Sequence, residues 1–275
     1  MREMSVQEIR DVSLEILRDV HNFCVKNNIQ YTLQGGTLLG AIRHKGFIPW
    51  DDDIDIAMPR PDYMRFIKTY TSENGFVAFS RELPEYKNSV FIAFTRICDV
   101  RRSYVDDSLL PWTSRNKGVW IDLFPLDGVE DSISRLKWRL KKMCFYWSQG
   151  NALRSAHNPF PPITRFGKFC HMIIKKIFVM FLSYNAIDKH IEECQKVNYQ
   201  DANFYCNLAF MRYGIRERHR KKVLEDTILA PFEKDFFFIM KGYDEALKEK
   251  YGDYMQLPPE GKRVRGHDYN KYYWK

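Results

Sequence analysis

The sequence lacks the features that mark secreted and membrane-spanning proteins. Its N-terminus, Met1 to Ser5, contains no apolar segment of the kind that a cleaved signal peptide requires. No uninterrupted apolar run approaches the ~20 residues that are needed to cross a bilayer. The cysteines show neither paired nor metal-ligand spacing; they are Cys24, Cys98, Cys144, Cys170, Cys194 and Cys206. We therefore expect a cytoplasmic protein whose thiols are reduced and mostly buried.

Disorder and nucleic-acid binding are not expected either. Apolar residues make up 45% of the 275 residues, which is ordinary for a globular protein with a sizeable core. The formal charge of +8 favours anionic partners such as nucleotides, phosphorylated glycans or an acidic membrane surface. The sequence shows no basic helix with base-reading spacing and no known nucleic-acid module, so nucleic acid is not an expected partner.

The clearest chemical pattern begins with a pair of glycines. Residues 31–33 predict a short strand that runs into Gly35 and Gly36, where backbone amides can approach a phosphate closely. Thr37 is predicted to cap a helix over residues 38–44, whose N-terminus favours anions. This part of the stretch therefore predicts a phosphate site.

Acidic residues follow at the start of the next predicted strand. Asp53 and Asp55 are spaced i and i+2, which places both carboxylates on one side of a strand while Ile54 and Ile56 face the core. Carboxylates this close raise each other's pKa unless a cation lies between them. A hard divalent metal explains the pair, namely Mg²⁺ with Mn²⁺ as the alternative, although a solvated acidic loop is the simpler structural explanation. A phosphate site beside a metal site is typical of phosphoryl or nucleotidyl transfer.

One more acidic residue interrupts an apolar strand that is predicted over residues 119–124. Asp122 stands there among Val, Trp, Ile, Leu and Phe. An unpaired carboxylate is costly to bury, so Asp122 should either pair with an arginine or ligate a metal. The motif context favours metal ligation beside Asp53 and Asp55.

These motifs together resemble the signature of the LicD family, a branch of the nucleotidyltransferase superfamily that includes the fukutin-related proteins. The superfamily pattern is Gly-Gly or Gly-Ser, a helix, Asp-x-Asp, and a third carboxylate on a later strand. The matching segments are Gly35-Gly36, the loop from Arg43 to Asp53, Asp53-Ile54-Asp55, Asp122, and Tyr251-Gly252-Asp253-Tyr254-Met255. The resemblance spans most of the chain, but residues 131–230 match only loosely. The gap between the glycines and the first aspartate is also longer than in many superfamily members.

The resemblance implies transfer of a substituted phosphoryl group, such as phosphocholine, from a CDP-linked donor to a hydroxyl of a cell-surface glycan or its lipid-linked precursor. Asp53, Asp55 and Asp122 would be the metal ligands and catalytic residues. Gly35, Gly36 and Thr37 would orient a donor phosphate. The base that accepts the hydroxyl proton would be Asp122 or His267, and the sequence does not choose between them.

Three arginines are further candidates for substrate binding. The resemblance implies this role for Arg43, which opens the acidic loop. Arg96 lies on an otherwise apolar strand face, where either a structural salt bridge or a phosphate contact would explain it. Arg263 and His267 either belong to a disordered basic tail or return to the active site.

Two other functions remain open from the sequence. A nucleotidyltransferase that releases pyrophosphate would use the same metal site. A non-catalytic glycan- or membrane-binding protein could keep the fold, but the intact acidic triad disfavours it. The donor could equally carry glycerol, ribitol, ethanolamine or a phosphonate analogue.

The expected fold is α+β, a nucleotidyltransferase-like mixed sheet flanked by helices with a helical insertion. We expect a catalytic core over residues 1–130, a helical subdomain over 131–200, and a C-terminal segment over 201–275 that packs back on the core. Residues 166–184 are very apolar between lysines. They predict either a helix packed on the core or an interfacial helix in peripheral contact with a membrane.

Local patterns predict several individual elements. Ser5 and Glu8 form a capping box that opens a helix ending near Lys26. Helices are also predicted over 61–70, 134–147, 185–198 and 243–251, and strands over 76–80, 90–99 and 236–240. Asp127 and Gly128 are predicted to form a turn, with Asp127 structural. The basic run over 212–222 is predicted to be a solvated face.

Overall fold

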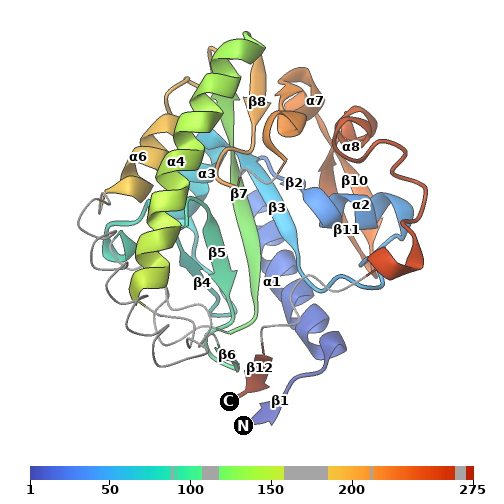
Figure 1. Cartoon of the computed structure of the whole chain (residues 1–275). Coiled ribbons are helices and arrows are strands. Elements are labelled where there is room, and N and C mark those ends of the chain that lie inside the picture. The colour runs from blue at the N-terminus through green and yellow to red at the C-terminus, as the bar shows by residue number, and fades with distance from the viewer. Residues whose placement is uncertain (88–89, 91, 107–117, 158–184, 211–212, 264–270) are drawn as a thin grey trace.

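In a computed structural model the chain folds around a mixed β-sheet flanked by helices (Figure 1). The structure describes residues 1–275 apart from 88–89, 91, 107–117, 158–184, 211–212 and 264–270. The strands of the main sheet stand in the order β2 (Thr32–Leu33), β3 (Asp55–Pro59), β7 (Trp120–Val129), β5 (Thr95–Cys98) and β4 (Val77–Phe79). Beyond this path, β8 (Phe204–Cys206) pairs with β7, and β9 (His219–Arg220) pairs with β8. The predicted α+β class is confirmed.

The centre of this sheet brings together residues that are far apart in the sequence. β3 and β7 are parallel, and Asp55 lies opposite Asp122 in their register. β5 runs antiparallel to β7 on its other side and places Arg96 opposite the same Asp122. Three charged residues therefore lie in one row across three adjacent strands.

The N-terminal helix α1 (Val6–Lys26) forms as the sequence predicts. The Ser5 side chain accepts a hydrogen bond from the Glu8 amide, and the Glu8 carboxylate accepts one from the Ser5 amide at 2.8 Å. This capping box satisfies two amides that a helix start leaves unpaired. The apolar face of α1, which includes the fully buried Ile16 and Leu17, packs on the core and contacts β7.

The second helix starts earlier than predicted. Helix α2 (Gly35–Arg43) begins at the glycines themselves, and its N-cap is Gln34. The prediction that Thr37 caps the helix is therefore wrong. The Thr37 hydroxyl instead accepts a hydrogen bond from the Asp55 amide at 2.8 Å, which ties α2 to the start of β3. The third helix, α3 (Arg60–Thr69), opens with Pro61 in its first turn and packs on β3 and β7.

Three further predictions need correction. Asp53 lies just before β3 rather than within it, so the two aspartates do not share a strand. Asp127 and Gly128 are part of β7 and form no turn, because β8 pairs with this end of the strand. The strand predicted over 90–99 is limited to the four residues of β5.

The C-terminal part of the chain packs against the N-terminal part. Strands β10 (Thr227–Phe232) and β11 (Asp235–Met240) form a hairpin, and the Met240 amide donates to the Thr32 hydroxyl at 2.8 Å. Strand β12 (Lys271–Trp274) pairs with β1 (Arg2–Glu3) and β6 (Ser103–Asp106), so the two termini lie side by side (Figure 1). Helix α8 (Tyr243–Tyr251) ends before Gly252, as predicted. The short elements are η1 (Pro84–Tyr86), η2 (Gly214–Glu217), α7 (Lys222–Glu225) and η3 (Glu260–Lys262).

Two helices enclose a second, smaller apolar cluster. Helix α4 (Ile133–His157), longer than predicted, packs on α6 (Ala186–Cys194) at one side of the molecule (Figure 1). Leu136, Leu140 and Met143 of α4 join Cys194 and Cys206 in this cluster. The cysteines in the described residues are free thiols, buried except for Cys144.

Some predictions lie outside the described residues. The segment 166–184, with its two alternative placements, is one of them, and so are Cys170 and His267. The division of the chain into three parts stays a prediction. Among the described residues, the helices are too short or too polar for any of them to span a membrane.

Candidate active site

A cavity of about 440 Å³ opens where β3, β5 and β7 meet the start of α2. It is lined by six of the residues that the sequence singled out: Gly35, Gly36, Asp53, Asp55, Arg96 and Asp122. The remaining lining residues are Gln34, Asp51, Phe94, Phe124, Asn207, Phe210, Tyr213, Glu217, Lys250 and Tyr251. The two halves of the predicted site, glycines and carboxylates, thus share one cavity.

The glycines are required here because carboxylates approach them closely. A Cβ added to Gly36 would lie 2.7 Å from Asp51 Oδ2, and one added to Gly35 would lie 3.2 Å from Asp55 Oδ2. Gly35 also has a φ of +59°, a conformation that side chains disfavour. The absence of two side chains therefore keeps the N-terminus of α2 next to the acidic residues.

Hydrogen bonds to main-chain groups of the acidic loop hold this loop in place. The Arg10 guanidinium on α1 donates to the carbonyl oxygens of Ile48, Pro49 and Asp51. At the other end of the loop, the Gln34 main-chain amide donates to the Asp55 carbonyl at 2.9 Å, and the Thr37 hydroxyl accepts from the Asp55 amide. The loop that carries the aspartates is thus held by α1 and α2. Sequence reasoning missed Arg10, because its partners are main-chain carbonyls.

Arg96 and Asp122 form an ion pair inside the cavity. Arg96 Nε donates to Asp122 Oδ1 at 2.8 Å, and both side chains are largely buried. The Arg96 guanidinium also lies over the Trp120 ring, 4.3 Å from its centroid. The salt bridge that was one explanation for Arg96 therefore exists, while the residue also lines the cavity.

The donor chemistry of the cavity suits a hard divalent cation. Carboxylates of Asp51, Asp53, Asp55 and Asp122 line it, and Mg²⁺ is commonly held by one or two carboxylates together with substrate phosphates and water. Within the described part of the chain, no group of three or more His, Cys, Asp or Glu side chains is arranged to hold a metal ion by itself. The carboxylates that line the cavity fit an ion that takes the rest of its ligands from a phosphate substrate and water.

Three predicted site residues that the structure describes, Thr37, Arg43 and Arg263, are not among the residues that line the cavity. Thr37 holds Asp55 through the hydrogen bond described above. Arg43 donates to the Tyr254 carbonyl at 2.8 Å and to His44. Arg263 lies over the Trp50 ring and donates to the Pro258 carbonyl at 2.8 Å. His267 lies outside the described residues.

The C-terminal part of the chain supplies cavity residues that the sequence analysis missed. Lys250 on α8 donates to Glu217 Oε1 at 2.5 Å, and the side chains of both are nearly buried. Burial raises the pKa of Glu217, against the opposing effect of Lys250. Burial also raises the pKa of the Tyr251 hydroxyl. Glu217 belongs to the basic run over 212–222 that was predicted to be a solvated face, but its side chain is buried. It is the single acidic residue in that run, and this was the only feature of the sequence that could have pointed to it.

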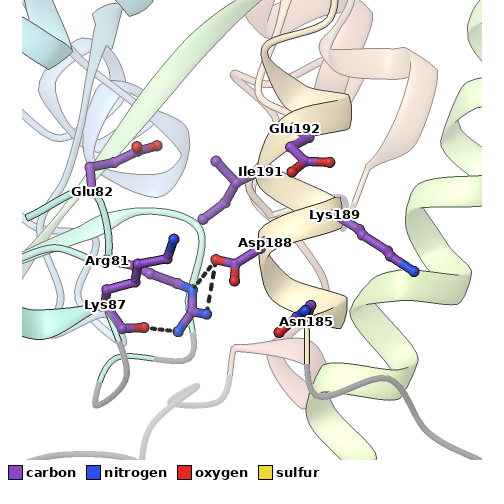
Figure 2. Close-up of a pocket in the computed structure, with 8 residues that line it drawn as sticks. All are labelled: Arg81, Glu82, Lys87, Asn185, Asp188, Lys189, Ile191 and Glu192. Carbon is purple, nitrogen blue, oxygen red and sulfur yellow. Dashed lines mark hydrogen bonds and ion pairs between the residues drawn. The ribbon is translucent and has the colours of Figure 1, made fainter. Parts of the chain in front are cut away.

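A second cavity, of about 400 Å³, lies between α6 and the segment that follows β4 (Figure 2). The Arg81 guanidinium donates to Asp188 Oδ1 at 2.9 Å and 3.2 Å, and to the carbonyl oxygens of Lys87 and Val90. Arg81 therefore joins α6 to the segment that follows β4. The first cavity remains the candidate active site.

A mixed sheet with carboxylates on adjacent parallel strands, beside a glycine-initiated helix, defines a nucleotidyltransferase-like protein. A family model described as LicD/FKTN/FKRP, nucleotidyltransferase domain, matches residues 28–160. The lipopolysaccharide cholinephosphotransferase LicD of Haemophilus influenzae is 32% identical over 271 residues, which cover 94% of this chain and 95% of that protein. The chain therefore belongs to the LicD family, and the resemblance seen in the sequence is confirmed.

More distant relatives match a shorter region. The ribitol 5-phosphate transferases FKRP of Mus musculus and Homo sapiens are each 32% identical over 98 residues. This region covers 34% of the present chain but only 20% of either relative. By their printed names, these relatives and LicD transfer a phosphate group that carries a small organic substituent.

Proposed function

We propose that this protein is a phosphotransferase that moves a substituted phosphoryl group, such as phosphocholine, from a CDP-linked donor to a hydroxyl of a glycan. The acceptor would be a cell-surface glycan or its lipid-linked precursor. The observation that carries the proposal is the register of β3 and β7, which sets Asp55 opposite Asp122 in a cavity that Gly35 and Gly36 also line. The near full-length similarity to a cholinephosphotransferase supports the choice of transferred group.

Each part of the cavity has a role in this reaction. Asp53, Asp55 and Asp122 would supply carboxylate ligands to Mg²⁺, or to Mn²⁺ in its place, and donor phosphates and water would supply the rest. The bound ion would neutralise charge on the donor pyrophosphate. The first turn of α2 would present backbone amides to a donor phosphate. Arg96 orients Asp122 through their ion pair.

The acceptor hydroxyl needs a base within hydrogen-bond reach. Asp122 and His267 are the two candidates. Asp122 lies in the cavity, where Arg96 already engages one of its oxygens. If both Asp122→Asn and His267→Gln lose activity, the pH dependence of their residual rates decides between the two residues. The general base must be deprotonated to act, so the rate falls on the acidic side of the profile. The variant that lacks the base should lose this fall.

The proposal is tested by incubating the protein with CDP-choline, CDP-ethanolamine, CDP-glycerol and CDP-ribitol, a glycan acceptor and Mg²⁺. Release of CMP supports phosphoryl transfer, whereas release of pyrophosphate in a parallel incubation with CTP would show nucleotidyl transfer instead. Asp55→Asn should lower turnover by about 10³-fold, because losing roughly 4 kcal/mol of transition-state stabilisation slows a reaction by that factor.

The matched control is Asp11→Asn, which removes one carboxylate from the exposed face of α1. Its turnover should equal that of the wild type. Full activity in Asp55→Asn would show that the metal assignment is wrong.

A further inference from the structure

The candidate active site contains a buried cation from the far end of the chain. Lys250 lies in the last turn of α8, and its side chain is 9% exposed. Its ammonium donates to Glu217 Oε1 and lies over the Tyr213 ring, 4.3 Å from the centroid. The centroid of the Tyr251 ring is 5.5 Å from the same ammonium. The carboxylate and the two aromatic rings hold the ammonium in one place.

That place is beside the helix terminus and the acidic residues. A Cβ built on Gly35 would lie 3.9 Å from Lys250 Nζ and 3.2 Å from Asp55 Oδ2. The ammonium and the carboxylate therefore lie next to the same point at the start of α2. A phosphate at this terminus would be within reach of α2 amides and Lys250 together.

A buried ion pair is weak evidence of stabilisation, because desolvation of both charges offsets much of their attraction. The pair of Lys250 and Glu217 also lines the cavity rather than the apolar core. Five carboxylates line the same cavity, so a polyanionic donor needs positive charge there besides a metal ion. A ligand role accounts for the position of the lysine in this cavity, next to the start of α2.

We infer that Lys250 binds a phosphate of the donor's pyrophosphate, next to the N-terminus of α2. This inference rests on the proposed function, which identifies the donor. The class of ligand that Lys250 would bind is a diphosphate. Lys250 supplies a compact charge with three donors, of which one is already used by Glu217.

The test measures binding of inorganic pyrophosphate with Mg²⁺ by titration calorimetry, which needs no turnover. Lys250→Met should weaken binding at least tenfold, and Lys250→Arg should recover most of it because the positive charge is kept. The matched control is Lys248→Met on the same helix, an exposed lysine paired with Asp244 that should bind as the wild type does.

Lys250→Met leaves Glu217 buried without its cation, so this variant could fail to fold. The double variant Lys250→Met with Glu217→Gln removes both charges, and it should bind pyrophosphate as weakly as the single variant. Circular dichroism establishes that each variant is folded. Wild-type pyrophosphate affinity in a folded Lys250→Met variant, single or double, would overturn the inference.

The two proposals fail separately. If the wild type releases CMP from none of the CDP-linked donors, the proposed function fails while the pyrophosphate titration still tests Lys250. If CMP is released, Lys250→Met should raise the donor KM at least tenfold. An unchanged KM together with unchanged pyrophosphate binding would contradict the inference and leave the proposed function intact.

Discussion

Replacing Asp127 with alanine should destabilise the fold strongly, because it leaves a buried arginine without its main partner. The Arg60 guanidinium donates to the two Asp127 carboxylate oxygens at 2.6 Å and 2.9 Å. The Asp127 side chain is 1% exposed and that of Arg60 is 11% exposed. Breaking such a buried pair from one side costs about 3–5 kcal/mol, since the remaining charge stays desolvated.

The structure places this variant at the lower end of that range. Glu82 lies 3.3 Å from Arg60 and keeps part of the compensation, although burial raises the pKa of Glu82. We expect a loss of about 3 kcal/mol in the free energy of unfolding. For a chain of this size that corresponds to a Tm lower by roughly 6–12 °C. Urea unfolding followed by tryptophan fluorescence measures the first quantity, and calorimetry measures the second.

A double-mutant cycle with Arg60→Met checks the cause. Arg60→Met with Asp127→Ala should be more stable than Asp127→Ala alone, because the double variant also removes the buried arginine charge that has lost its main partner. A loss below about 1 kcal/mol in Asp127→Ala, or a double variant whose losses simply add, would refute the reasoning.

Three further predictions concern pH, backbone strain and a helix cap. Burial lowers the pKa of His190 below its ordinary 6.5, so below pH 6.5 the imidazole takes up a proton when the protein unfolds. The free energy of unfolding should therefore fall as the pH is lowered, by up to about 1.4 kcal/mol per pH unit, until the pKa of the folded state is reached. His190→Asn should flatten this dependence in urea unfolding between pH 7.5 and 5.5, and an unchanged slope would contradict it. Gly35→Ala should cost about 1–2 kcal/mol at its positive φ and lower CMP release by displacing Asp55, whereas Gly261→Ala, which meets nothing within 4 Å, should change neither. Ser5→Ala should lower the free energy of unfolding by about 1 kcal/mol, and an unaltered urea midpoint would show that the capping box contributes nothing.

Local signals in the sequence predicted the elements that depend on neighbouring residues. The capping box of α1 and the glycine that follows α8 involve groups within four residues of each other, so their spacing is readable. The glycine and aspartate motifs were also readable, because their types and order mark the chemistry. Thr37 shows the limit of such reasoning: a hydroxyl at a helix start suggests a cap, yet its partner is the amide of Asp55, which follows a loop.

Contacts between distant segments were not predictable in the same way. The sequence offered Asp122 two explanations, and the register of three strands decided that it meets both Asp55 and Arg96. For Lys250 the sequence predicted only that it belongs to a helix, whereas packing against Glu217 makes it a buried cation of the cavity. A single polar residue carries no periodic signal, so its burial depends on which segments pack around it.

The sequence by itself determined the family, the fold class and the kinds of residue that the chemistry uses, because these follow from local spacing and composition. The tertiary structure alone decided which of those residues meet. Strand register and helix packing set distances between groups that lie tens of residues apart, and these depend on the whole core rather than on any one segment.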